Sequence, residues 1–264
     1  MLYRYFESIK IDTFGVIPFS LVENELLPYS QNRLPQSPRS VISVLFPYFT
    51  KQDRKNVSLY AVVSDYHKVI EKKLSIVCEM LKEDYPQNSF VCFVDNSPVK
   101  EVLAAAYAGL GVIGKNNLLI NEKYGSFVFI GEIVTDLEIE YSCHEIKGCI
   151  DCGKCVSACP SDNLKSFERE MCLSRITQKK SELTQNEKAL IKRCGSAWGC
   201  DICSIVCPMN EGVQETDIEE FLEDMVPVVT AENLKSLKNR AFSWRPDEVI
   251  LRNIEIVDPQ KTIG

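Results

Sequence analysis

Cysteine is the residue type whose spacing carries the most chemical information in this chain of 264 residues. Two runs in its second half end in Cys-Pro, and they consist of Cys149, Cys152, Cys155 and Cys159, and of Cys200, Cys203 and Cys207. In the first run, the cysteines are separated by two, two and three residues and followed by Pro160. This pattern is typical of bacterial cubane [4Fe-4S] sites. The sequence therefore predicts two iron–sulfur clusters and one-electron chemistry.

The ligands are expected to be shared between the two runs. In proteins with two such clusters, the cysteine before the proline binds the cluster of the other run. The first cluster would then be bound by Cys149, Cys152, Cys155 and Cys207. The second would take Cys159, Cys200 and Cys203. Its fourth ligand is Cys172, our preferred choice, or the alternative Cys194, which lies six residues before Cys200.

Zinc and disulfide bonds are the competing interpretations of these cysteines. Zinc favours paired Cys-x-x-Cys units that form one tetrahedral site, whereas three evenly spaced cysteines with a remote fourth suit a cubane better. Disulfides require an oxidising compartment, and Met1 to Lys10 lack a signal-peptide pattern. Among the remaining cysteines, Cys78 and Cys92 lie between apolar residues and are expected to be buried thiols. The sequence assigns no role to Cys143.

Composition narrows the class of protein further. A hydrophobic content of 45% allows a sizeable core. No apolar run approaches the roughly 18 residues of a membrane span, so we expect a cytoplasmic protein that does not enter a membrane. The net charge of −7 excludes a broad electrostatic footprint for nucleic acid. It still allows a local basic patch, for example Lys179, Lys180, Lys192 and Arg193.

The periodicity of apolar residues predicts an α+β protein. An α/β domain spans residues 1–140, a double-cluster ferredoxin-like domain spans 141–212, and a short helical tail spans 213–264. Strands are predicted at 41–46, 89–94, 118–120 and 127–134, and helices at 65–84 and 98–110. Two short helical stretches are expected in the tail.

Three features of the first 140 residues exceed what an electron carrier needs. A glycine-dense segment, Gly109 to Asn117, lies between a predicted helix and a strand, and its glycines would allow close approach of a ligand. Asp95 stands at a strand end, where it either serves a pocket or caps the helix predicted to begin at Pro98. His67 falls in the first turn of a helix and is either functional or simply solvated.

Over roughly residues 35–212, the chain resembles the epoxyqueuosine reductase family. The resemblance rests on the ligand cysteines and on a colinear series of motifs. These are Arg39–Val44, Tyr60-Ala61, Asp65–Lys68, Val94-Asp95 with Pro98, Ala108–Gly111, Ile113–Asn116, Tyr124–Ser126, Gly131-Glu132, and Gly199–Asp201 through Cys207-Pro208 with Asn210.

The resemblance implies an oxidoreductase that catalyses the last step of queuosine synthesis in tRNA with cobalamin and two [4Fe-4S] clusters. Cobalamin would lie between the N-terminal α/β domain and the cluster module, and the substrate epoxide would lose its oxygen as water. Asp95 matches the family's proton donor, His67 is taken as a second catalytic residue, and Cys172 matches the fourth ligand of the second cluster. Positions that match cobalamin contacts are Ser58, Asp95, Asn116, Leu119, Ile130, Ser174 and Asp201. The expected partners are tRNA or a small-molecule substrate, and an external electron donor such as a flavodoxin or ferredoxin.

The chain also departs from the family pattern. Members usually continue into a helical-repeat domain, whereas this sequence ends about 55 residues after the second cluster. Met209 stands where tryptophan is usual, Arg175 replaces tyrosine, and Leu59, Val63 and Ser64 replace a stretch that typically contains arginine and glycine. Two alternatives therefore stay open. They are a dicluster electron-transfer protein without its own substrate, and a corrinoid reductase of another electrophile, such as an organohalide.

Overall fold

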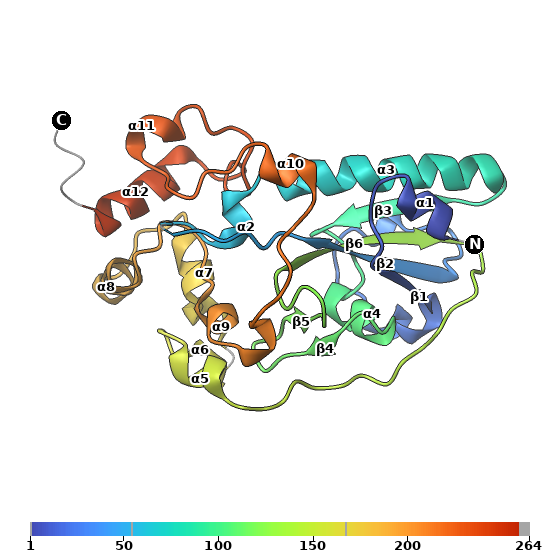
Figure 1. The fold of residues 1–264 in the computed structure, drawn as a ribbon, viewed down its shortest axis with the longest axis horizontal. Coiled ribbons are helices and arrows are strands. Elements are labelled where there is room, and N and C mark those ends of the chain that lie inside the picture. Colours follow the sequence, from blue (N-terminus) through green and yellow to red (C-terminus); the bar gives the residue numbers. More distant parts are fainter. Residues whose placement is uncertain (1, 54, 167, 259–264) are drawn as a thin grey trace. The chain divides into compact units, whose positions relative to one another are not determined.

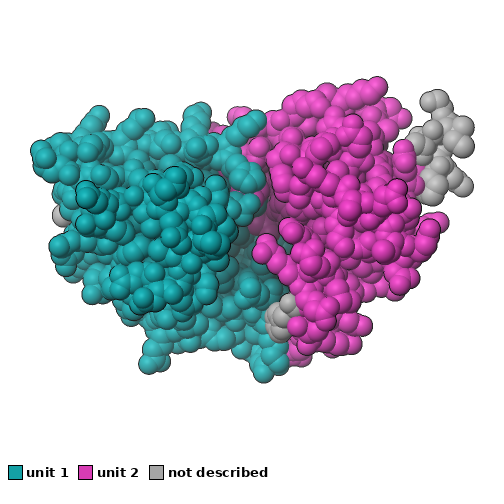
Figure 2. Space-filling view, turned by 180° about the vertical axis from the view of Figure 1, so that it is seen from behind, with its two compact units in different colours: residues 1–47, 67–151 teal, residues 48–66, 152–264 magenta. Residues whose placement is uncertain are grey.

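The computed structural model describes residues 2–53, 55–166 and 168–258 (Figure 1). The chain forms two compact units. Unit 1 comprises residues 1–47 and 67–151, and unit 2 comprises residues 48–66 and 152–264 (Figure 2). Residues 48–66 therefore belong to the unit that is built mainly from the second half of the sequence. The three-domain division at residues 140 and 212 stays a prediction, because compactness alone does not define domain borders.

A four-stranded antiparallel sheet forms the centre of unit 1. Its order is β1 (Phe14–Pro18), β2 (Ser40–Pro47), β6 (Val128–Thr135) and β3 (Phe90–Val94). Every residue of β2 is buried, as expected for an apolar, β-branched run in the interior of a sheet. The predicted strands at 41–46, 89–94 and 127–134 are confirmed, and β1 is an additional edge strand.

One face of this sheet is covered by the long helix α3 (Tyr66–Asp84) (Figure 1). Its buried residues Ile70, Leu74, Val77 and Leu81 recur at helical spacing and form its apolar face. Cys78 on the same helix, expected to be a buried thiol, is half-buried. A Cβ at Gly131 of β6 would lie 2.8 Å from Leu74 and 2.9 Å from Ile70. Glycine at this position therefore lets α3 approach the sheet closely.

The opposite face is covered by α4 (Glu101–Tyr107), whose Ala104 and Ala105 pack in one core with Leu45 and Phe93. Helix α4 begins three residues later than the helix predicted from Pro98. Unit 1 is completed by α1 (Tyr3–Glu7), by short 3-10 helices at Phe19–Leu21, Glu23–Glu25 and Gln31–Arg33, and by the strand pair β4 (Val112–Ile113) and β5 (Leu119–Ile120).

Unit 2 is built from short helices. They are α2 (Leu59–Val62), α5 (Lys154–Ala158), α6 (Asn163–Ser166), α7 (Leu173–Thr177), α8 (Gln185–Cys194), α9 (Ile202–Ile205), α10 (Glu219–Leu222), α11 (Ala231–Leu234) and α12 (Asp247–Val257), with 3-10 turns at Arg169–Met171 and Pro208–Asn210. Helix α8 starts with a capping box between Thr184 and Glu187 and ends at Gly195 in the left-handed conformation.

The C-terminal part of unit 2 is more ordered than the predicted tail. It holds three helices instead of two, and α12 packs against α7, α8 and α11. Asn253 of α12 is fully buried and donates hydrogen bonds to the carbonyls of Thr177 and Ala197, at 2.7 and 2.9 Å. Residues 259–264 of the predicted tail lie outside the described residues. The helices within the described ranges are all too short or too polar to cross a lipid bilayer.

Candidate functional site

The two predicted catalytic residues lie together in unit 1. Asp95 follows β3 directly, and His67 stands in the first turn of α3. The His67 Nε2 atom lies 3.4 Å from an Asp95 carboxylate oxygen, and the two side chains are 36% and 61% exposed, respectively. Asp95 therefore presents a carboxyl group at the surface of unit 1, with an imidazole beside it.

The structure contradicts the alternative that Asp95 caps the following helix. Lys100 is the N-cap residue of α4, and no side chain forms a cap hydrogen bond there. Asp95 has a φ of 55°, which places its backbone in the left-handed region. Asp tolerates this region better than most residues, and such backbone recurs at functional sites. The tight backbone at the end of β3 thus positions the carboxyl group.

Two further carboxyl groups lie near Asp95, and the sequence did not single them out as site residues. Glu132 of β6 is fully buried, and Glu101 is half-buried at the start of α4. Burial, followed by the charge of Asp95, raises the pKa of Glu101 to about 8, against the opposing effects of the Asp95 backbone N–H and of His67. Burial, followed by the charge of Glu101, holds the pKa of Glu132 well above its usual range.

The remaining positions that match cobalamin contacts in unit 1 lie on or near the small strand pair and on β6. Asn116 is half-buried in the connection between β4 and β5, and its side-chain oxygen accepts a hydrogen bond of 3.4 Å from the Leu118 N–H. Leu119 is buried in β5, and Ile130 is half-buried on β6. An amide and two apolar side chains are suitable neighbours for a corrin, whose rim carries amides around an apolar ring.

In unit 2, Ser58 and Asp201 are brought together although 143 positions separate them. Asp201 is buried and accepts hydrogen bonds from the Ser58 hydroxyl, from the Leu59 N–H at 2.9 Å and from Lys55 Nζ at 2.5 Å. These bonds hold residues 55–59 against the start of α9. Ser174 of α7 is half-buried, and its carbonyl accepts a hydrogen bond of 2.8 Å from Thr177.

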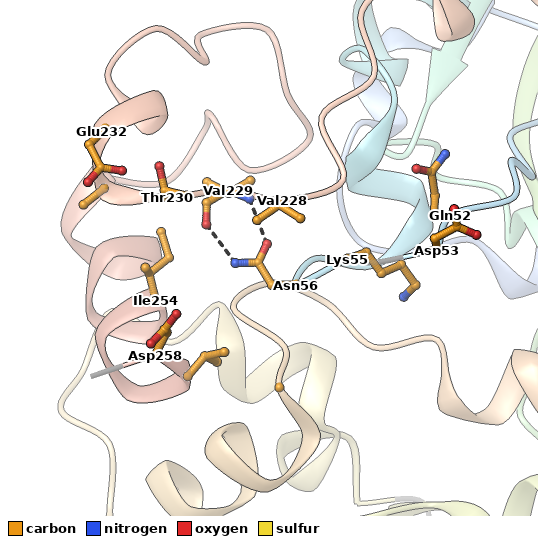
Figure 3. A pocket seen from close by; sticks show the side chains of 13 residues that line it. Gln52, Asp53, Lys55, Asn56, Val228, Val229, Thr230, Glu232, Ile254 and Asp258 are labelled. Carbon is orange, nitrogen blue, oxygen red and sulfur yellow. Dashed lines mark hydrogen bonds between the residues drawn. The ribbon is translucent and has the colours of Figure 1, made fainter. Parts of the chain in front are cut away.

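A pocket of about 580 Å³ lies in the same unit (Figure 3). Asn56 forms one of its walls, and its side-chain amide exchanges two hydrogen bonds of 2.8 Å with the backbone of Val229. The lining consists of Gln52, Asp53, Lys55, Asn56, Gly195, Val228–Glu232, Ile254, Val257 and Asp258. None of these lining residues is among the catalytic, cobalamin-binding or cluster-binding residues predicted from the sequence. We therefore do not assign the functional site to this pocket.

The cysteines predicted for the first cluster lie on short, tightly turned segments. In unit 1, the Cys149 N–H donates a hydrogen bond of 3.1 Å to the Ile113 carbonyl. In unit 2, Gly153 caps α5 with a φ of 72°, a conformation that favours glycine, and so turns the chain between Cys152 and Cys155. Helix α5, which carries Cys155, packs against α9, which carries Cys203.

The surroundings of Cys159 favour a thiolate. Burial raises its pKa, but the backbone N–H groups of Leu164, Ser161 and Asn163 and the Ser161 hydroxyl outweigh burial and lower the pKa overall. Deprotonated cysteine is the form that ligates iron and other metals. The donor set and this stabilisation therefore fit an iron–sulfur cluster.

The candidates for the second cluster also gather in unit 2. Burial raises the pKa of Cys200 to about 12, and the charges of Cys203, Asp201 and Cys172 add to this effect. Cys172, the preferred fourth ligand, lies at the N-cap of α7. Burial raises the pKa of Cys194, Arg193 opposes this effect, and the charge of Cys159 adds to it. The choice between Cys172 and Cys194 therefore stays a prediction.

Comparison with protein families gives two matches. The model described as "Epoxyqueuosine reductase QueG, DUF1730" matches residues 30–96, and the model of a "4Fe-4S double cluster binding domain" matches residues 148–210. An epoxyqueuosine reductase of Listeria monocytogenes is 31% identical over 96% of this chain and 72% of its own length. The corresponding protein of Lactococcus garvieae is 34% identical over 79% of this chain, which spans only 62% of that relative.

Solved structures give the same result. Epoxyqueuosine reductase from Streptococcus thermophilus superposes with a TM-score of 0.78 at 25% identity, covering 97% of this chain and 79% of that protein. A second solved structure contains an epoxyqueuosine reductase with an epoxyqueuosine-modified stem loop of tyrosine tRNA. It superposes with a TM-score of 0.74 at 22% identity, and the alignment covers 97% of this chain and 79% of that protein.

Proposed function

This chain belongs to the epoxyqueuosine reductase family, and from this premise we propose that it converts epoxyqueuosine to queuosine in tRNA. Membership confirms the family predicted from the motifs, the mixed α/β fold and the oxidoreductase class. The double-cluster domain confirms the two [4Fe-4S] clusters and excludes zinc and disulfides as the main interpretation. The observation that carries the proposed reaction is the pairing of Asp95 with His67 at 3.4 Å.

We propose that Ser58, Asp95, Asn116, Leu119, Ile130, Ser174 and Asp201 contribute to a cobalamin site. When bound, cobalamin supplies a strongly reducing cobalt centre, whereas the protein supplies binding and orientation. Asn116 would offer an amide as a hydrogen-bond partner for the cofactor, and Leu119 and Ile130 would offer apolar surroundings. Asp201 would contribute to the site indirectly, because its three hydrogen bonds fix the shape of residues 55–59.

Asp95 acts in this proposal as the general acid. Conversion of the epoxide to an alkene breaks two C–O bonds, forms one C=C bond and consumes two electrons and two protons. The exposed carboxyl group of Asp95 donates a proton to the departing oxygen, and that oxygen leaves as water. His67, whose Nε2 atom lies 3.4 Å from an Asp95 carboxylate oxygen, holds this carboxyl group in position. A positioned acid of this kind contributes about 10²- to 10⁴-fold to a rate.

The substrate is the modified nucleoside within tRNA, acted on in the cytoplasm. A related structure with an epoxyqueuosine-modified tRNA stem loop supports this choice over a free small molecule. The overall charge of −7 is compatible with tRNA only if contacts are local. The acid role is tested by Asp95→Asn in reconstituted enzyme. We expect clusters and corrinoid to be retained while turnover falls by about 10²-fold or more.

We further propose that an external flavodoxin or ferredoxin supplies the electrons beside the second cluster. Residues 160–195 carry eight Lys and Arg against five Asp and Glu, although the whole chain is acidic. A groove of about 560 Å³ lies in this segment, with Met171, Ile176 and Leu190 in its lining and Pro160 next to the predicted ligand Cys159. Its apolar floor and basic surroundings suit an acidic protein partner.

The exposed Lys180 and Lys192 provide a test of the docking surface. The double variant Lys180→Glu/Lys192→Glu should slow cluster reduction by flavodoxin much more than reduction by dithionite, because only the protein partner has to dock on this surface. Lys72→Glu, an exposed change on α3, is the matched control. Normal reduction by flavodoxin combined with weaker tRNA binding would assign the basic surface to tRNA instead.

The two alternative functions make different predictions. An electron carrier without its own substrate would contain both clusters but retain no corrinoid and produce no queuosine. A corrinoid reductase of another electrophile would retain corrinoid, leave epoxyqueuosine unchanged and turn over a substrate such as an organohalide. Corrinoid content and nucleoside analysis of the same preparation therefore separate all three functions.

A further inference from the structure

The turn that carries Asp95 has a backbone that needs support from its surroundings. Asp95 and Ser30, a residue that contacts this turn, have φ values of 55° and 56°, in the left-handed region that residues other than glycine rarely adopt. Such backbone persists where neighbouring contacts hold it in place. The His67 Nε2 atom lies 3.4 Å from the Asp95 carboxylate, beyond the usual hydrogen-bond range of about 2.7–3.2 Å. The chain on both sides of Asp95 therefore carries part of the positioning of this carboxyl group.

Residues 25–33 contact the chain just before Asp95. The Arg33 guanidinium donates a hydrogen bond of 3.0 Å to the Cys92 carbonyl of β3. The same guanidinium lies over the ring of Phe93, 4.6 Å from the ring centre. Strand β3 lies at an edge of the sheet and pairs with β6. The two contacts of Arg33 therefore add a second support to the strand that leads to Asp95.

The same segment contacts the turn just after Asp95. The Ser30 hydroxyl donates a hydrogen bond of 2.9 Å to the side-chain oxygen of Asn96. The Leu27 N–H donates a hydrogen bond of 2.7 Å to the Pro98 carbonyl. Since Asn96 follows Asp95 directly, the Ser30 hydroxyl holds the chain beside the proposed acid. One segment thus contacts the chain on both sides of Asp95.

A single exposed hydrogen bond holds a turn only weakly. Because water competes for the same groups, such a bond shifts an equilibrium by about 2- to 12-fold. The contacts of Ser30, Arg33 and Leu27 act together, since moving the turn away from the segment breaks all of them. A displacement of about 1 Å at a catalytic group can lower a rate by about 10²-fold. Loss of these joint contacts should therefore be visible in turnover.

We propose that residues 25–33 set the orientation of the Asp95 carboxyl group, with Ser30 and Arg33 as positioning residues that act through the turn after β3. This inference rests on the proposed role of Asp95 as the general acid. Ser30 and Arg33 need not touch the substrate or the cofactor. Ser30 has the more specific role, because its partner Asn96 is the immediate neighbour of Asp95.

Hydrogen exchange of the cluster-loaded protein tests this positioning without turnover. The Leu27 N–H reports on the turn, because its hydrogen bond to the Pro98 carbonyl joins the segment to the turn. Ser30→Ala keeps the Cβ atom, so the cost of the left-handed backbone is unchanged. This variant should accelerate exchange at Leu27 by about 2- to 12-fold and leave the amides of β2 and β6 unchanged. Ser37→Ala, at an exposed serine of the same connection, is the matched control.

Unchanged exchange at Leu27 in Ser30→Ala would overturn the proposal. Faster exchange in Ser37→Ala as well would also overturn it, because the effect would then not depend on the contact with Asn96.

A double-mutant cycle tests the connection from Ser30 to Asp95. Ser30→Ala and Asn96→Ala, at equal iron and corrinoid content, should each lower kcat by about 2- to 12-fold and leave KM for the tRNA stem loop unchanged. The double variant should be no slower than the slower single variant, because both changes remove the same hydrogen bond. Single losses that multiply in the double variant, or an unchanged kcat in Ser30→Ala, would overturn the proposal.

Arg33 is tested by adding Arg33→Ala to Ser30→Ala. The combined variant should lose more kcat than Ser30→Ala alone, because the two residues hold the chain on opposite sides of Asp95. No further loss would overturn the role of Arg33.

The two readouts separate this inference from the proposed function. If the wild type yields no queuosine but Leu27 exchanges faster in Ser30→Ala, the proposed reaction is wrong and the support of the turn by residues 25–33 stands. If queuosine forms and Ser30→Ala changes neither exchange nor kcat, the reaction stands and the positioning role is wrong.

Discussion

The free energy of unfolding of the wild type should fall as the pH rises, and replacing Glu101 with Gln should abolish the part of this decrease that comes from Glu101. Burial is the main cause that raises the pKa of this carboxyl group to about 8, from an ordinary value of 4.5. The folded protein therefore holds the Glu101 proton more tightly than the unfolded chain does. The resulting stabilisation is complete below pH 4.5, decreases as the pH rises above that value, and is lost by about pH 8.

The size of the effect follows from the two pKa values. Each pH unit between them changes the free energy of unfolding by about 1.4 kcal/mol. Between pH 5 and 7, the wild type should lose about 2.5 kcal/mol relative to Glu101→Gln, whose amide does not titrate. The difference should level off above pH 8, once Glu101 is ionised in both the folded and the unfolded state.

Urea denaturation at pH 5, 6, 7 and 8 measures this difference. Both tryptophans, Trp198 and Trp244, lie in unit 2, so tryptophan fluorescence follows unit 2 and far-UV circular dichroism adds the sheet of unit 1. Glu122→Gln is the control for a change at an exposed carboxyl group. A difference between wild type and Glu101→Gln that stays within about 0.5 kcal/mol from pH 5 to 7 would show that folding does not raise the Glu101 pKa.

Two further predictions concern unit 2. Cys172→Ser should reduce the iron content from about eight to about four atoms per chain, because the second cubane needs a fourth thiolate. Cys194→Ser should leave the iron content unchanged. The reverse result would make Cys194 the ligand. Asp201→Ala should lower the free energy of unfolding of unit 2 by about 3 kcal/mol, because it removes the carboxylate that pairs with the largely buried Lys55 amine and accepts a hydrogen bond from the Leu59 N–H. Urea titration followed by tryptophan fluorescence measures this loss, and a value below about 1 kcal/mol would mean that water replaces Asp201.

The central strands and α3 could be predicted from the sequence because their apolar residues recur at the spacing of buried elements. The run Val41 to Phe46 forms β2, and the periodic positions of α3 face the sheet. Strand β1 was missed because its five residues include Gly15 and end at Pro18, and both residue types are common in turns. Helix α12 was missed as a packed element because its contacts with α7 and α8 are distant in sequence.

The sequence predicted those parts of the candidate site that belong to recognisable motifs. The cysteine spacing and Asp95 at the end of a strand were found from the sequence. Glu132 was not singled out, although alternation places it on the same face of β6 as the buried Val134, and a charged residue at such a position is a usable signal. The pairing of Ser58 with Asp201 depends on residues 48–66 joining unit 2, which local patterns do not encode.

The central claim is that this chain reduces epoxyqueuosine in tRNA with Asp95 as the acid. The most direct test is anaerobic incubation of the cluster-loaded, cobalamin-supplied protein with a reductant and an epoxyqueuosine-containing tRNA stem loop, followed by nucleoside mass spectrometry. We expect queuosine to replace epoxyqueuosine in the wild type and to be nearly absent with Asp95→Asn of equal iron and corrinoid content. Unchanged epoxyqueuosine with the fully loaded wild type, or equal queuosine from both proteins, would contradict the claim.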